Sequence, residues 1–451
     1  MGSGEWKKTF LSEGGVTSDF TDDEIRSLFS QVLAQACAEL GKISSVLLIP
    51  PDITRFHSRA GFLTGIACKN LTRAGITVKA LPALGTHTPL TASECERMFP
   101  DVPKSLFLIH DWRSDVVELA RISRKWVEKA TAGAVSYDWP VQVNKILRDG
   151  GFDLIISLGQ VVPHEIVGMA NHSKNLFIGT GGKEAIDKSH FAGACFGMEK
   201  MMGRADTPIR AMLDEGLRLS NGMLPPVLYA LTVIGARSEA EAAGSGKPGG
   251  SLALRGLFCG FGRSCFEEAA ALSRRINVNL LDEPVHKAVA YLEPEEFRST
   301  WLGNKAIYRT RMAMADKGEL LIIAPGLKSF GEDKGIDALI RKHGYRPSNV
   351  IKEKVGKDPE LADGLSAAAH LIHGSSEGRF TVRYCPGPGI SRQEIESVGF
   401  EWGDIGEAEA RYDIHKLAAG WNTGAGGEKF FFVPKPALGL WALRDTFTGE
   451  Q

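Results

Sequence analysis

The sequence predicts an α/β protein made of two domains, each with a mostly parallel sheet. Short apolar runs rich in Val, Ile and Leu alternate with stretches of helical length, which is the pattern of parallel strands joined by crossover helices. The chain has 451 residues, more than one ordinary domain holds. We place the domains at residues 1–280 and 281–451, and we expect an active-site cleft at the interface between them.

The first domain contains the clearest strand signals. The run at residues 43–49 (ISSVLLI) is typical of a buried strand and stops at Pro50-Pro51, because proline cannot donate to a strand ladder. The Thr-Ala-Ser-Glu stretch from Thr91 resembles a capping box and predicts a helix start. The expected strands are 43–49, 78–84, 106–109 and 154–158. The expected helices are 61–74 and the one that begins near Thr91.

A low-complexity stretch at residues 237–251 separates two strand-like runs, 227–234 and 252–258, and predicts a long exposed hairpin connection. We expect the domain boundary near residues 277–284, because a second alternating pattern begins after it. The elements expected there are strands at 319–324 and 380–384 and helices at 335–342 and 392–398.

Charge and cysteine content narrow the classes of function. The chain has 53 basic and 54 acidic side chains, so nothing attracts it as a whole to nucleic acid or to an anionic membrane, and a small-molecule partner is favoured. Its seven cysteines are scattered without a CxxC pair, which indicates reduced thiols rather than a zinc or redox site. No leader pattern and no apolar run of about 18 residues occurs, so we expect a soluble cytoplasmic protein.

Residues suited to acid–base chemistry lie in the loops that follow these strands. Asp52 and Arg55 follow the first strand, His87 follows the second and His164 follows the last. In parallel sheets, ligands gather at the carboxyl ends of the strands. Imidazole titrates near neutrality, so we predict that His87 and His164 transfer protons; the alternative for either is a structural loop histidine.

Several motifs, taken together, resemble the lactate racemase family, the nickel-pincer-nucleotide enzymes. They are Asp52-Ile53-Thr54-Arg55, Gly85-Thr86-His87-Thr88-Pro89, Pro163-His164 with Lys174 ten residues and His190 a further sixteen residues along the chain, and Trp301-Leu302-Gly303-Asn304-Lys305. The chain also departs from the family pattern. It has Asn171-His172-Ser173-Lys174 in place of Ser-Gly-Gly-x-Lys, Phe56-His57 in place of a proline, and Trp301-Leu302 in place of Tyr-Gln. The resemblance therefore leaves the substrate open.

The resemblance implies an isomerase that inverts C2 of a 2-hydroxy acid by reversible hydride transfer through a 2-keto acid. Hydride transfer avoids abstracting the very weakly acidic proton beside a carboxylate. The resemblance also implies a cofactor, the nickel complex of pyridinium-3,5-bisthiocarboxylic acid mononucleotide, attached covalently through Lys174. His190 would be the imidazole ligand of nickel, and Lys174 would join the metal site through this attachment.

The same resemblance and the chemistry of the residues assign the remaining roles. Lys305 would bind substrate, with Trp301 in the same motif. From their chemistry, Arg55 offers a planar fork for a substrate carboxylate and Asp52, in the cofactor site, can orient a histidine; the alternative for these two is a surface ion pair. Gly181 and Gly182 could present backbone N–H groups to the cofactor phosphate, or form an ordinary turn. The first domain would bind the cofactor and carry out catalysis, and the second would close over the substrate. The expected partners are a 2-hydroxy acid and the enzymes that make the cofactor and insert nickel.

The polar residues beside the motifs favour a sugar acid such as an aldonate, because buried substrate hydroxyls need hydrogen-bond partners. They are His57, Ser58, Asn171 and His172. Other hypotheses remain open: a zinc-type hydrolase or lyase that uses His87, His164 and His190, and a non-enzymatic nickel or nucleotide carrier. From the sequence alone, His172 is an alternative metal ligand to His190.

Overall fold

The computed structural model describes residues 8–237, 241 and 252–448, and the chain forms two compact units. The first unit consists of Met1–Ser189 and Met201–Ile276, and the second of His190–Lys200 and Asn277–Gln451. The second unit thus includes a short segment from the middle of the chain.

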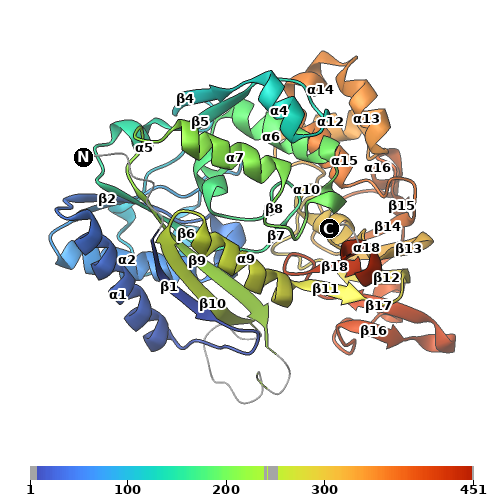
Figure 1. Cartoon of the computed structure of the whole chain (residues 1–451). Coiled ribbons are helices and arrows are strands. Elements are labelled where there is room, and N and C mark those ends of the chain that lie inside the picture. The colour runs from blue at the N-terminus through green and yellow to red at the C-terminus, as the bar shows by residue number, and fades with distance from the viewer. Residues whose placement is uncertain (1–7, 238–240, 242–251, 449–451) are drawn as a thin grey trace. The chain divides into compact units, whose positions relative to one another are not determined.

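The first unit is built on a six-stranded sheet with the order β1-β10-β9-β6-β2-β3 (Figure 1). Neighbouring strands from β3 to β9 run parallel, whereas β10 and β1 are antiparallel to their neighbours. The strands are β1 (Thr9–Gly14), β2 (Ser45–Ile49), β3 (Thr77–Ala80), β6 (Leu154–Gln160), β9 (Val227–Ala236) and β10 (Leu252–Phe261).

Both faces of this sheet are covered by helices. Along β9, Leu228 and Ala230 pack into the core shared with α1 (Asp22–Leu40) and α2 (Ala60–Arg73), whereas alternate residues of the strand pack into a second core with α9 (Ser264–Asn277). This alternation follows from the two-residue period of a strand and explains why the run is apolar throughout.

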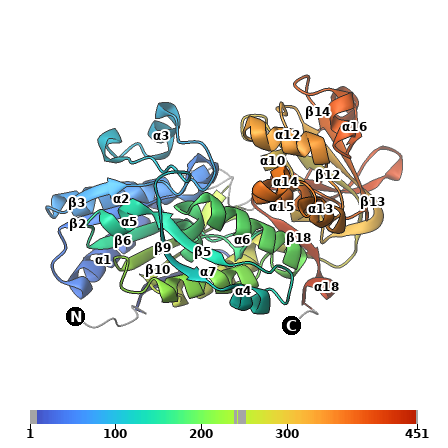
Figure 2. The ribbon, with the colours of Figure 1, turned by 90° about the horizontal axis from the view of Figure 1, so that it is seen from above.

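Beside the sheet, a hairpin of β4 (Val116–Ile122) and β5 (Trp139–Asn144) lies with α4, α6 and α7, as Figure 2 shows. The remaining elements of this region are α3 (Ala92–Met98), α4 (Arg124–Ala130), α5 (Lys145–Asp149), β7 (Pro163–His164), β8 (Gly168–Met169), α6 (Lys183–Phe196) and α7 (Pro208–Leu219). The capping box at Thr91 is present and starts α3, as the sequence predicted.

The second unit is built on another six-stranded sheet, with the order β15-β14-β13-β12-β17-β16, in which only β16 is antiparallel to its neighbour. Its strands are β12 (Val285–Tyr291), β13 (Met314–Ala324), β14 (Thr381–Pro386), β15 (Glu401–Trp402), β16 (Gly420–Thr423) and β17 (Lys429–Val433), with a separate parallel pair, β11 (Val278–Leu281) and β18 (Leu440–Leu443). Its helices are α10 (Thr300–Gly303), α11 (Lys305–Thr310), α12 (Lys334–His343), α13 (Ser348–Val355), α14 (Pro359–Asp363), α15 (Leu365–His373), α16 (Arg392–Ser397), α17 (Ile405–Arg411) and α18 (Arg444–Thr448).

Two mostly parallel sheets confirm the α/β class predicted from the sequence. One expected strand, at residues 106–109, is wrong: a 3₁₀ turn occupies Lys104–Leu106, Phe107 makes a single bridge to Ala80, and Ile109 is 68% exposed. The segment is apolar but too short to extend the ladder beyond the edge strand β3.

The antiparallel pairing of β9 and β10 confirms that the two runs are neighbours, while most of the connection between them, residues 238–240 and 242–251, lies outside the described residues. None of the helices in the described ranges has both the length and the apolarity needed to cross a membrane.

Candidate functional site

The first part of the site is a buried carboxylate paired with a histidine. Asp52 follows β2 and caps a 3₁₀ helix, Ile53–Ser58, where its Oδ1 accepts hydrogen bonds from the backbone N of Thr54 (3.1 Å) and from its hydroxyl (2.6 Å). Its Oδ2 is hydrogen-bonded to Nδ1 of His87, which follows β3. The carboxyl ends of two neighbouring strands thus bring together residues 35 positions apart.

This pairing determines the charge on Asp52 and the tautomer of His87. Burial by itself would raise the pKa of Asp52, but the charge and hydrogen bond of His87, with contributions from Thr54 and Arg55, lower it. Asp52 is therefore ionised at neutral pH, and its carboxylate accepts a hydrogen bond from the protonated Nδ1 of His87. Neutral His87 then has its lone pair on Nε2, the atom a general base needs.

His164 is held in a different way. It lies in β7, a few residues beyond β6, and only 7% of it is exposed. Its Nδ1 accepts a hydrogen bond from the backbone N of Ile166 (3.1 Å), so neutral His164 carries its proton on Nε2. Oε2 of Glu165 lies 3.7 Å from the same Nδ1 and can pair with His164 when the ring is protonated. The two histidines therefore present opposite hydrogen-bonding groups on Nε2.

Lys174 lies near the same carboxylate and histidine pair, at the start of a π-helical turn, Asn175–Gly179. The pKa of its amine is lowered to about 8, first by burial and then by the charge of Arg55, while the charges of Glu165 and Asp52 oppose this shift. Lys174 thus lies within electrostatic reach of residues from two loops, after β2 and after β7, and of Arg210 on α7. In the first unit, Asp52 and Arg55 act on Lys174 through their charges, and His87 is hydrogen-bonded to Asp52. His164 lies in the same unit and precedes Glu165, whose charge also acts on Lys174.

The loop before Lys174 has an unusual backbone. Asn171 and His172 both have positive φ angles, 71° and 58°. His172 is buried, its Nε2 lies 3.1 Å from the carbonyl oxygen of Gly262, and its ring centroid lies 4.0 Å from that of Tyr229. Burial, with the nearby charge of Arg210, holds the pKa of His172 well below its usual range. These contacts give His172 a packing role in the loop.

Beside His57, which the sequence analysis singled out, lies a glutamine that it missed. Gln160, the last residue of β6, is 4% exposed, and its Oε1 lies 3.1 Å from Nε2 of His57. Among the described residues, Nε2 of Gln160 is buried and has no hydrogen-bond partner. The signal in the sequence is a large polar side chain at the end of a strand that is mostly apolar. Ser58, by contrast, accepts a hydrogen bond from the backbone N of Ala60 (3.2 Å) and supports the local turn.

Close packing explains the glycines at 181 and 182. A Cβ on Gly181 would lie 1.9 Å from the carbonyl oxygen of Phe177, and one on Gly182 would lie 2.5 Å from Oε1 of Gln142. His110 also lies 3.0 Å from the carbonyl oxygen of Gly181 through its Nε2. The two glycines precede α6, where backbone N–H groups favour an anion, so a role with the cofactor phosphate stays a prediction.

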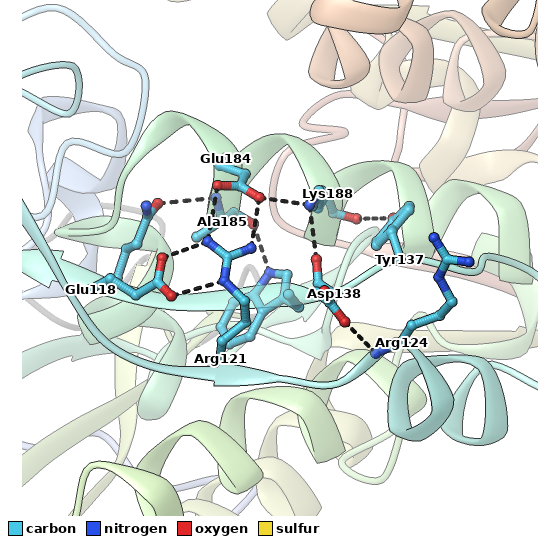
Figure 3. Close-up of polar contacts among 10 residues, drawn as sticks. Glu118, Arg121, Arg124, Tyr137, Asp138, Glu184, Ala185 and Lys188 are labelled. Atoms are coloured by element: carbon cyan, nitrogen blue, oxygen red, sulfur yellow. Dashed lines mark hydrogen bonds and ion pairs between the residues drawn. The ribbon is translucent and has the colours of Figure 1, made fainter.

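The β4–β5 hairpin anchors α6, the helix that carries His190 (Figure 3). The indole N–H of Trp139 donates to the carbonyl oxygen of Ala185 (2.9 Å), and the hydroxyl of Tyr137 donates to that of Lys188 (2.5 Å). Arg121 of β4 pairs with Glu184 on the helix (3.1 Å). These contacts fix the first turns of α6, whereas His190 follows the point at which the chain passes into the second unit.

Three predicted site residues, His190, Trp301 and Lys305, belong to the second unit. Trp301 lies in α10 with its ring centroid 4.4 Å from that of His370. Lys305 is the first residue of α11, and its Nζ lies 5.7 Å from the ring centroid of Phe297. In the described part of the chain, no group of three or more His, Cys, Asp or Glu side chains is arranged to hold a metal ion.

Comparison with known proteins identifies one domain and a set of similar folds. Residues 21–202 match the family model described as the lactate racemase N-terminal domain. This range contains Asp52, His87, His164, Lys174 and His190. No match was found among the curated proteins.

Solved structures resemble the chain over almost its whole length. A crystal structure of a protein from Thermotoga maritima has a TM-score of 0.75 and 23% identity, and the match covers 94% of this chain and 100% of the other. The lactate racemase apoprotein from Thermoanaerobacterium thermosaccharolyticum has a TM-score of 0.67 and 15% identity, with 96% and 94% covered. At these identities the likeness shows a shared fold, including both α/β units.

Proposed function

We propose that the chain is an isomerase of the lactate racemase family that inverts C2 of a 2-hydroxy acid, because residues 21–202 match the lactate racemase N-terminal domain. The observation that carries the proposal is the position of Lys174, whose amine has a pKa lowered to about 8 and lies within electrostatic reach of Asp52 and Arg55. Asp52 in turn holds His87 with Nε2 as its acceptor atom. An amine for cofactor attachment and a base therefore occur in one place.

The residues fit the nickel-pincer nucleotide that the family uses. When bound, this group would supply a reversible acceptor for the hydride of substrate C2. Attachment through an amine needs its neutral form. With a pKa of about 8, about a tenth of the Lys174 amine is neutral at pH 7, several hundred times the neutral fraction of an ordinary lysine. Lys174 would hold the group covalently, and His190 would ligate its metal.

The chain's own residues would bind the substrate and move its hydroxyl proton. Arg55 offers a planar fork for the substrate carboxylate. His87 accepts the hydroxyl proton on Nε2, and the carboxylate of Asp52 stabilises the resulting imidazolium. His164 donates a hydrogen bond to the oxygen from Nε2 when neutral. When it is protonated to deliver a proton, Glu165 is the carboxylate that stabilises it.

The test is intact-protein mass spectrometry after co-production with the enzymes that make the cofactor and insert nickel. We expect the mass of the nucleotide adduct on the wild-type chain, its absence in Lys174→Ala and its presence in the control Lys183→Ala. Racemisation followed by polarimetry should appear only in the adduct-bearing protein. An active enzyme without an adduct would exclude this function.

For the substrate, we propose a sugar acid such as an aldonate. The buried Nε2 of Gln160 has no partner among the described residues, and burying an amide without a hydrogen bond costs about 1–3 kcal/mol, which a substrate hydroxyl would offset. His57, hydrogen-bonded to the same amide, would help to orient it. Gln160→Leu should reduce kcat/KM for an aldonate at least tenfold and leave that for lactate within twofold. Full wild-type activity on lactate with none on aldonates would contradict this proposal.

The zinc hydrolase or lyase alternative has less support. It needs His87, His164 and His190 to share one metal, but among the described residues no group of three or more His, Cys, Asp or Glu side chains is arranged to hold one. Nδ1 of His164 also accepts from the backbone N of Ile166, which leaves the proton of the neutral ring on Nε2, so that neither nitrogen can bind a metal in this arrangement. Chelator treatment separates the two functions, because a zinc enzyme would lose activity without carrying any nucleotide mass.

A further inference from the structure

A fully buried arginine lies under the loop that carries Lys174. Arg210, on α7, has no exposed surface. One of its terminal nitrogens, Nη1, donates to the carbonyl oxygen of Asn171 (3.1 Å) and to the hydroxyl of Ser173 (2.9 Å), and the other, Nη2, donates to the carbonyl oxygen of Met169 (2.5 Å). All three acceptors belong to the five residues before Lys174. Burying a charged guanidinium costs free energy unless it is hydrogen-bonded, so losing these contacts would destabilise the fold.

Two neighbouring side chains, Phe266 and Asp214, hold the arginine and the loop in place. The guanidinium lies over the ring of Phe266, 4.3 Å from its centroid, which limits its rotation. Asp214, one turn further along α7, accepts a hydrogen bond from the hydroxyl of Ser173 (3.2 Å), the same hydroxyl that accepts from Arg210. The loop is therefore bonded to α7 through the hydroxyl of Ser173, which contacts both Arg210 and Asp214, and through the backbone carbonyls of Met169 and Asn171.

The loop needs such support because of its backbone. Asn171 and His172 adopt left-handed φ angles, which cost an ordinary residue about 1–2 kcal/mol each. The family motif Ser-Gly-Gly-x-Lys places glycine, which adopts such angles without this cost, at the same two positions. This chain has neither glycine, so contacts from outside the loop must maintain the shape.

We propose that Arg210 is a positioning residue: its planar fork holds residues 169–173, with Asn171 and His172 left-handed, in the conformation that places the Lys174 amine for cofactor attachment. This inference rests on the proposed role of Lys174. Lysine could not replace the fork, because one ammonium on a flexible stem does not present two coplanar nitrogens to Met169 and to Asn171.

The test compares Arg210→Lys with Arg255→Lys as a matched control. Arg255 is also buried in the first unit, 3% exposed, and donates to the backbone oxygens of Ser18 (2.9 Å) and Ala236 (2.7 Å). In the cofactor-free proteins, amide hydrogen exchange read by mass spectrometry should rise at least tenfold for residues 170–176 in Arg210→Lys. The β2 and β6 amides should stay unchanged, and Arg255→Lys should leave residues 170–176 as in the wild type.

A rescue experiment separates positioning from general stability. Asn171→Gly removes the cost of one left-handed residue, so adding it to Arg210→Lys should restore at least half of the adduct yield that Arg210→Lys loses. Denaturant titration of the single and double variants shows whether the recovery of adduct exceeds what a general gain in stability would give. Wild-type exchange in Arg210→Lys, an equal change in Arg255→Lys, or no recovery with Asn171→Gly would overturn the inference. A wild-type chain that never acquires an adduct would refute the proposed function, while the exchange comparison would still decide the role of Arg210.

Discussion

The lowered pKa of Lys174 gives a prediction that can be measured without cofactor or substrate. Trace labelling with an amine-selective anhydride, followed by peptide mass spectrometry, reports the neutral fraction of each lysine as pH is varied. Normalising the Lys174 signal to its own plateau at high pH removes differences in accessibility. We expect its labelling midpoint near pH 8.

The magnitude follows from the shift. At pH 8 about half of the Lys174 amines are neutral, whereas a lysine with the ordinary pKa of 10.5 is neutral in about 0.3% of molecules, so the reactive fraction is about 150 times larger. The same shift makes folding pH-dependent. Because the folded pKa lies below the unfolded one, the cost of burying the charged amine is fully present below about pH 8, and it disappears as pH rises towards 10.5.

Two variants, which should shift the pKa of Lys174 in opposite directions, test whether neighbouring charges set that pKa. Arg55 lowers the pKa of Lys174, so Arg55→Met should move the midpoint to higher pH. Glu165 raises it, so Glu165→Gln should move the midpoint to lower pH. A wild-type midpoint near 10.5, or two variants that shift in the same direction, would refute the electrostatic account of this site.

Three further predictions concern the site and its supports. Asp52→Asn removes the charge-assisted bond to His87, worth about 1.5–3 kcal/mol, so kcat should fall about 10- to 150-fold in a racemisation assay; an unchanged kcat would show that His87 needs no partner. Gly181→Ala should lower the free energy of unfolding by about 1–3 kcal/mol in denaturant titration, because its Cβ would meet the backbone of Phe177; a neutral result would mean that this loop yields easily. Arg121→Met removes only half-exposed ion pairs and should change the same free energy by less than about 1 kcal/mol, and a larger loss would indicate that the hairpin depends on them.

Much of the fold follows from local patterns in the sequence. The apolar run before Asp52, the run before His164 and the capping box at Thr91 each correspond to an element whose limits lie within a few residues of those predicted. The segment 106–109 fails because four apolar residues satisfy a strand pattern without showing whether a neighbouring strand is available. Short apolar segments are ambiguous for that reason.

The sequence by itself determined the α/β class and the loops in which chemistry could occur, because hydrophobic period and motif spacing are properties of neighbouring residues. Only the tertiary structure decided that Asp52 holds His87, that Arg55 and burial lower the pKa of Lys174, and that Arg210 supports its loop. Each of these depends on atoms brought together from distant parts of the chain, where burial strengthens charge interactions and no periodic signal in the sequence records the contact.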